Sequence, residues 1–100
     1  SEPWLLIPAE TQQAELILSD RRGVLDRFMR LNCWLKKVTV PMEEKDGVIR
    51  YHVTLYYEKT DEPELVIRLL SMGPDIEILS PESLQQETIR RVRKQTELLK

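Results

Sequence analysis

The chain has 100 residues, which is the length of one compact domain with a single modest core. A formal charge of -2, from 15 basic and 17 acidic residues, excludes a uniformly basic nucleic-acid module, and 41% apolar residues exclude a disordered chain. Cys33 and His52 are each the only residue of their type, which excludes an intramolecular disulfide and a Cys/His zinc set. No apolar run reaches the roughly 18 residues of a membrane span, so we expect a cytoplasmic domain without membrane contact.

The first elements in chain order are a strand and a helix. Alternating apolar positions predict the strand at residues 14–18. Ser19 and Asp20 then offer side chains that can cap a helix, and apolar residues recur at helical spacing through residues 24–31. We therefore expect a helix of about three turns after the strand.

Two strands joined by a hairpin are predicted next. Residues 38–42 alternate between apolar and other side chains, and so do residues 49–57. Between them, Asp46 and Gly47 form a dipeptide that suits the positive φ angles of a tight turn.

The last third of the chain predicts a helix, a strand and a final helix. Apolar residues at helical spacing mark a helix over residues 65–70, and Gly73 suits the position after its end. A short strand follows at residues 75–79. Ser80 and Pro81 are typical of the cap and first position of a helix that runs to the C-terminus.

This order of elements favours an α+β fold, namely a ferredoxin-like βαββαβ sandwich with an additional C-terminal helix. Right-handed crossovers place two helices on one face of a four-stranded antiparallel sheet and leave the other face to the last helix, a partner or water. The strand positions expected to face the helices are Leu16, Leu18, Val38, Val40, Tyr51, Val53, Leu55, Ile76 and Ile78. Those expected on the other face are Glu15, Ile17, Lys37, Thr39, Arg50, His52, Thr54, Tyr56, Glu77 and Leu79.

No combination of residues in the sequence predicts catalysis, a metal site or a cofactor. His52 is expected to be a solvated or hydrogen-bonded strand residue, and Cys33, beside Trp34, a small packing residue. The three glycines lie far apart, which excludes a glycine-rich phosphate loop. Tyr56 is a single aromatic side chain among carboxylates on the predicted outer sheet face, which makes a poor platform for stacking RNA bases. We therefore expect a domain that is not an enzyme.

Charge is distributed unevenly along the chain. Residues 51–81 hold two basic and six acidic side chains, whereas residues 82–100 hold five basic and three acidic ones. On a helical wheel, the last helix carries Arg90, Arg93 and Lys94 on the side opposite its apolar residues. This basic face is a candidate contact for an anion or nucleic acid, and a solvated amphipathic helix is the alternative. The first helix region could extend such a surface with Arg21, Arg22, Arg27 and Arg30.

An apolar arm precedes the first predicted strand. Trp4, Leu5 and Ile7 lie between two prolines in an extended segment. A domain of this size has little surface with which to cover them, so they are a candidate inter-domain or dimer contact. Packing on their own domain is the alternative.

Residues 53–57, 64–73 and 76–84 form a recognisable pattern of strand, helix, strand and helix start. In this pattern the second half of the chain resembles the C-terminal extension (WCX) domain of bacterial WYL-domain transcriptional regulators. In that family a strand leads to a helix ending in two leucines and a glycine, and a further strand, a proline and a leucine follow. The matching residues here are Leu69, Leu70, Gly73, Pro81 and Leu84. The family commonly has arginine after the last leucine, where this sequence has Gln85.

The resemblance implies a ferredoxin-like C-terminal module of a longer regulator. Such regulators have an N-terminal winged helix-turn-helix for DNA and a central WYL domain, which in several members senses single-stranded nucleic acid; the WYL motif is absent from this sequence. The extension domain is implied to dimerise and to sense the effector. We therefore expect a homodimer, with residues 1–12 as a linker arm from a preceding domain and residues 13–100 as one regulatory domain.

An alternative function is an ACT-like regulatory domain that binds a small molecule and is attached to an enzyme or regulator. Such a site usually has a glycine-rich turn after the first strand. Residues 19–23 contain one glycine, Gly23.

Overall fold

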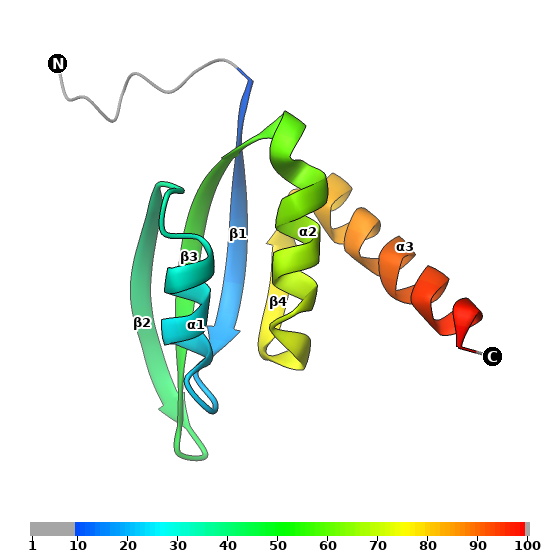
Figure 1. Cartoon of the computed structure of the whole chain (residues 1–100). Coiled ribbons are helices and arrows are strands. Elements are labelled where there is room, and N and C mark those ends of the chain that lie inside the picture. The colour runs from blue at the N-terminus through cyan, green and yellow to red at the C-terminus, as the bar shows by residue number, and fades with distance from the viewer. Residues whose placement is uncertain (1–9, 100) are drawn as a thin grey trace, which may run out of the picture.

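A computed structural model describes residues 10–99. Its elements are β1 (Thr11–Ser19), α1 (Val24–Leu31), β2 (Lys37–Lys45), β3 (Val48–Glu58), η2 (Lys59–Asp61), α2 (Glu62–Leu70), η3 (Gly73–Asp75), β4 (Ile76–Ser80) and α3 (Glu82–Leu98). The strands form one antiparallel sheet in the order β2-β3-β1-β4, with α1 and α2 over the same face (Figure 1). The predicted α+β architecture, compatible with a ferredoxin-like fold and extended by a C-terminal helix, is confirmed.

The core forms where the alternating strands meet the apolar stripes of the two crossover helices. In α1, Val24 and Phe28 are one turn apart and both are buried against the sheet, and in α2 the buried residues are Leu65, Val66 and Leu69. From the strands the core receives Ala14, Leu16, Leu18, Val53, Leu55, Tyr57 and Ile78. Burial of each larger side chain contributes about 1.5 to 3 kcal/mol to folding, so these contacts supply the main driving force.

The helix α1 is shorter than the predicted three turns. It has eight residues and begins at Val24, because the backbone of Arg22 and Gly23 has positive φ angles of 54° and 73°. Asp20 still contributes to the helix start, since its Oδ1 accepts a hydrogen bond of 3.2 Å from the backbone N–H of Leu25.

The edge strand β2 has the opposite orientation to the one predicted. Val38 pairs with Thr54 and Val40 with His52, and directly paired residues lie on the same face of an antiparallel sheet. Val38 and Val40 therefore lie on the face away from α1 and α2, where they are 53% and 51% exposed. Conversely, the two residues placed on the outer face by prediction, Lys37 and Thr39, lie on the helix side.

The C-terminal helix α3 does not cover the open face of the sheet. Its N-cap is Pro81 and not the predicted Ser80, because Ser80 is paired with Glu15 at the end of β4. The helix contacts β4 and α2 and then extends away from the domain (Figure 1). Of its 17 described residues, Leu84 alone is buried.

Candidate functional site

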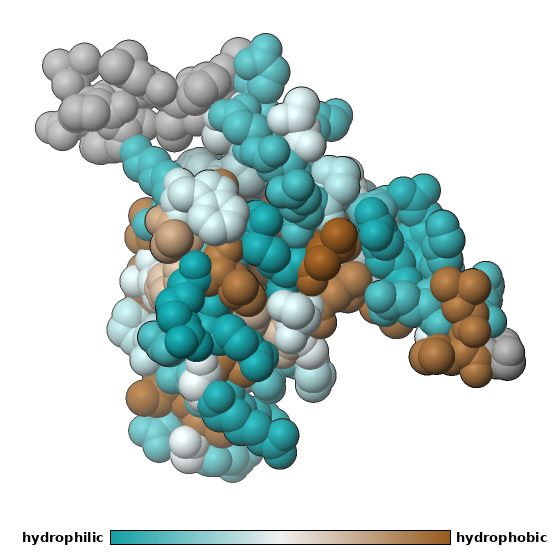
Figure 2. All heavy atoms as spheres, in the orientation of Figure 1, coloured by the Kyte–Doolittle hydropathy of each residue, from teal (hydrophilic) through white to brown (hydrophobic). Residues whose placement is uncertain are grey.

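The distal half of α3 carries apolar side chains that the domain leaves uncovered. The wheel predicted one apolar face through Leu84, Thr88, Ile89, Val92, Thr96 and Leu99. After Leu84, however, Ile89 and Val92 are 39% and 46% exposed, and apolar residues gather at the free end of the helix (Figure 2), where Leu98 and Leu99 are exposed. This apolar stripe, formed by Ile89, Val92 and Leu99, is therefore available to another surface.

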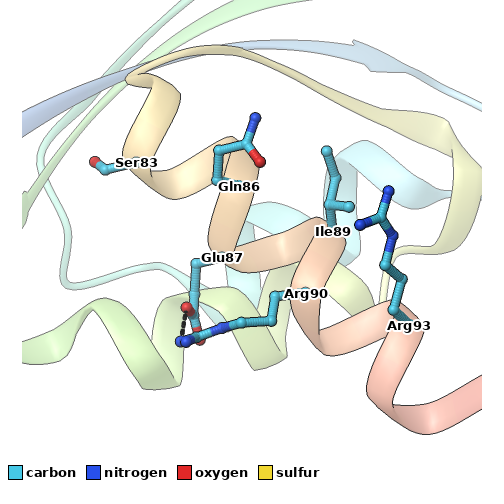
Figure 3. A pocket seen from close by; sticks show the side chains of 6 residues that line it. All are labelled: Ser83, Gln86, Glu87, Ile89, Arg90 and Arg93. Carbon is cyan, nitrogen blue, oxygen red and sulfur yellow. Dashed lines mark hydrogen bonds and ion pairs between the residues drawn. The ribbon is translucent and has the colours of Figure 1, made fainter. Parts of the chain in front are cut away.

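The predicted basic residues of α3 form an exposed face, which meets the apolar stripe where Arg93 lies beside Ile89 (Figure 3). Arg90, Arg93 and Lys94 are all exposed, and Glu87 binds both Arg90 and Arg91. Within residues 10–99, neither Arg93 nor Lys94 takes part in an ion pair. The unneutralised charge of the face therefore lies at Arg93 and Lys94, whereas that of Arg90 is partly offset by Glu87.

A shallow groove of about 400 Å³ follows the basic face (Figure 3). Arg90 turns toward Glu87 in this groove, while Ile89 and Arg93 lie beside each other. The lining residues are Ser83, Gln86, Glu87, Ile89, Arg90 and Arg93. All of them belong to α3, so the groove has one wall and requires a second surface to enclose a ligand.

The arginines near α1 do not extend the basic face of α3. In Figure 1, α2 lies between α1 and α3, which separates the two sets of cations. Arg21 lies 3.8 Å from Asp75, and Arg30 lies 3.5 Å from Asp26 one turn earlier. The two sets therefore do not form one continuous basic surface, which the sequence had left open as an alternative. The apolar arm residues Trp4, Leu5 and Ile7 lie outside the described residues.

A polar network crosses the middle of the open sheet face. Glu15 of β1 accepts hydrogen bonds from Thr54 Oγ1 at 2.8 Å and Gln13 Nε2 at 2.9 Å, and its Oε2 lies 3.0 Å from His52 Nε2. His52 is thus a paired strand residue, as predicted. Burial raises the pKa of Glu15, but the hydrogen bonds from Gln13 and Thr54 and the charge of His52 outweigh it and lower the pKa below its ordinary value of 4.5.

The lowered pKa makes the domain more sensitive to acid. A carboxylate whose pKa is lower in the folded than in the unfolded chain stabilises the fold at pH values above its unfolded pKa, here about 4.5. This contribution is lost as the pH falls through the folded pKa. Between about pH 6 and about pH 3, the free energy of unfolding measured in urea should therefore depend less steeply on pH in Glu15→Gln than in the parent. Glu44→Gln, on an exposed carboxylate of β2, is the control. Equal flattening by both variants would contradict the role of Glu15.

Both outer strands of the sheet are protected against pairing with another strand. Pro41, which has no backbone N–H to donate, lies within β2, and the register of β2 with β3 shifts between Pro41 and Glu44. At the other edge, Gln85 Nε2 of α3 donates a 3.1 Å hydrogen bond to the backbone oxygen of Ile78 in β4. The amide at the position where the family commonly has arginine is therefore used on the sheet edge. These features disfavour the pairing of a further strand at either edge of the sheet.

A buried polar link between α1 and α2 carries no clear sequence signal. Asn32 is fully buried after α1; its Nδ2 donates to the Phe28 carbonyl at 3.0 Å, and its Oδ1 accepts from Arg68 Nε of α2 at 2.9 Å. The Arg68 guanidinium also lies over the ring of Trp34, with Cζ 4.9 Å from the centroid. Trp34 is 64% exposed and Cys33 is exposed, so the prediction that Cys33 is a small packing residue is wrong.

No helix within residues 10–99 is both long and apolar enough to cross a membrane. Among these residues, no group of three or more His, Cys, Asp or Glu side chains could hold a metal ion.

Comparisons with known proteins identify the family. A search of curated proteins gave no match. The family model described as the WCX domain matches residues 10–95, which include the whole sheet, both crossover helices and most of α3. This match supports a regulatory C-terminal domain in general. Because it covers far more than half of the chain, the chain belongs to the WCX domain family.

Proposed function

We propose that this chain is the non-catalytic dimerisation and effector-sensing domain of a WYL-type, DNA-binding transcriptional regulator that acts in the cytoplasm. In this proposal, a helix-turn-helix outside the present sequence binds operator DNA. A WYL domain, also outside it, binds a single-stranded nucleic acid effector together with the present domain. Membership of the WCX family supports a regulatory role, and the surfaces of α3 support the two more specific functions.

The observation that carries the proposal is the uncovered distal half of α3. Its apolar stripe, which includes Ile89 and Val92, is exposed although it continues from buried Leu84. Apolar area that one chain leaves in water favours association with a second surface, at about 25 cal/mol per Å² buried. Arg93 lies beside Ile89 of this stripe (Figure 3), and together with exposed Lys94 it offers charge to the phosphates of a nucleic acid. One helix thus presents both an association surface and a basic surface.

Dimerisation is tested by sedimentation equilibrium of the full chain and of two variants. One carries Ile89→Ser and Val92→Ser, and the other carries Trp4→Ser, Leu5→Ser and Ile7→Ser. We expect the α3 double variant to dissociate at concentrations where the parent is dimeric, and the arm variant to weaken the dimer if the arm crosses to the second copy. A chain that stays monomeric, or a dimer that neither variant changes, would contradict dimerisation through these surfaces.

Effector binding is tested by titrating labelled single-stranded DNA into the full-length regulator. Reversing Arg90, Arg93 and Lys94 to glutamate should weaken binding and make its salt dependence shallower. The matched control reverses three exposed cations elsewhere, Arg27, Arg30 and Lys59. If both triple variants bind alike, the basic face of α3 has no specific role in binding the effector.

A further inference from the structure

A second basic site lies at the opposite end of the sheet from the start of β1, where β1 ends and the β2–β3 hairpin turns (Figure 1). The structure has a hollow of about 290 Å³ here, several times the share of about 30 Å³ that one water molecule occupies in the liquid. Two stretches of chain far apart in the sequence, residues 19–21 and 45–50, contribute its walls, in contrast to the one-sided groove on α3. The lining residues are Ser19, Arg21, Lys45, Asp46, Val48 and Arg50.

Strand register explains why these side chains meet. Ser19, the last residue of β1, lies directly opposite Arg50 of β3, and Lys45 of β2 lies opposite Val48. Positions 48 and 50 are two apart on one strand, so they lie on the same face, the open face of the sheet. Arg21 joins them from the following loop, which is held to β3 by a 2.9 Å hydrogen bond from the Asp20 backbone N–H to the oxygen of Ile49.

The charges of the hollow are not balanced. Three cations line it against one carboxylate, Asp46, and Arg21 has one long ion pair, 3.8 Å, with Asp75 outside the lining. Among the described residues, neither Lys45 nor Arg50 takes part in an ion pair. The Arg50 Nε is also buried and has no hydrogen-bond partner within residues 10–99. A buried donor on a charged group is costly unless an acceptor meets it, so an anion that accepts a hydrogen bond from Arg50 Nε would be favoured in this hollow.

We propose that this hollow binds a phosphate group, either of a small phosphorylated molecule or of a phosphodiester strand. The guanidinium groups of Arg50 and Arg21 can each donate more than one hydrogen bond to phosphate oxygens, and Lys45 adds a point charge. The Ser19 hydroxyl can donate one further bond. A doubly charged tetrahedral anion offsets the cations better than a single carboxylate does. The site does not depend on the proposed dimerisation or on the basic face of α3.

The test is a titration of the isotope-labelled full chain with inorganic phosphate, in which amide chemical shifts are measured by NMR. A parallel titration with chloride at the same ionic strength is the reference. Saturable shifts are expected at the amides of residues 19–21 and 45–50. Arg50→Gln should weaken binding about tenfold, and Lys45→Gln, at an exposed site that leaves the fold intact, should weaken it about threefold. Arg27→Gln, the same charge change on α1, should leave binding unaltered. Shifts that do not saturate, or that neither Arg50→Gln nor Lys45→Gln reduces, would overturn the proposal.

A second arm distinguishes the two sources of phosphate. Short oligothymidylate without terminal phosphate is titrated in parallel. If the site holds a phosphodiester, Arg50→Gln should lower by about one the slope of the logarithm of the binding constant against the logarithm of the salt concentration. Binding of inorganic phosphate without binding of the oligonucleotide assigns the site to a small phosphorylated molecule. If neither ligand binds in a manner sensitive to Arg50→Gln, the site is excluded. Because α3 is unaltered in these variants, failure here is separate from failure of the proposed function.

Discussion

Replacing Leu84 with alanine is expected to destabilise the domain by about 2 to 5 kcal/mol. Leu84 is fully buried and is the one buried residue among the 17 described residues of α3, so it anchors this helix to β4 and α2. Alanine has a higher helix propensity than leucine, but the difference of a few tenths of a kcal/mol is small beside the cavity that the change leaves. Urea unfolding followed by circular dichroism measures the loss.

Ile67→Ala is the matched control for Leu84. Ile67 lies on α2, outside the proposed association surface, and is 54% exposed, so the change should alter the free energy of unfolding by no more than about 0.5 to 1 kcal/mol. The dependence of that free energy on urea concentration adds a second criterion: it should fall for Leu84→Ala if α3 detaches from an otherwise folded domain. Equal costs for the two variants would contradict the role of Leu84 as an anchor.

The order of elements and the sheet could be predicted because local patterns determine them. Residues 49–57 alternate over nine positions, and Asp46 and Gly47 have the positive φ angles, 53° and 77°, that the dipeptide predicted. A strand between two others must bury one face against the helices, so for β1 and β3 alternation also gives the correct orientation. These two strands supply most of the core residues contributed by the sheet.

The orientation of β2 could not be predicted in the same way. Alternation of Val38 and Val40 with polar residues gives the period of a strand but not which of its faces is turned inward. At a sheet edge, the pairing with the neighbouring strand determines which side chains face the helices. Here Val38 lies opposite Thr54, and Thr39 lies opposite buried Val53. The apolar pattern therefore marks the open face, which becomes less polar than predicted.

The candidate surface on α3 was predicted only in part. The wheel predicted an apolar side and a basic side of the helix, because both properties repeat at the helical period, but in the structure Arg93 lies beside Ile89 of the stripe. Periodicity does not show how far along the helix the contacts with the domain extend, so only the structure shows that Ile89 and Val92 are exposed. The hollow around Arg50 required it as well, since its residues converge only through strand register.

Replacing Asn32 with alanine is expected to cost about 1 to 3 kcal/mol. The change removes the acceptor of Arg68 Nε and the side-chain donor to the Phe28 carbonyl, both in a site that is closed to water at Asn32. Phe28 keeps a backbone bond from Asn32 at 3.1 Å, so most of the cost comes from the guanidinium, whose side chain is 15% exposed. Asn32 and Arg68 are 36 residues apart in sequence, so the sequence could suggest only a helix end at Asn32.

A double-mutant cycle with Arg68→Met separates this link from simple loss of volume. Methionine keeps an apolar stem beside Trp34 but has no donor for Asn32, so Asn32→Ala should cost about 1 kcal/mol less in the Arg68→Met background than in the parent. Thermal or urea unfolding of the four proteins gives the coupling free energy. Additive costs would mean that Asn32 acts only by ending α1. A clear coupling would establish that one buried amide holds the two crossover helices together, and thereby fixes the surface from which α3 departs.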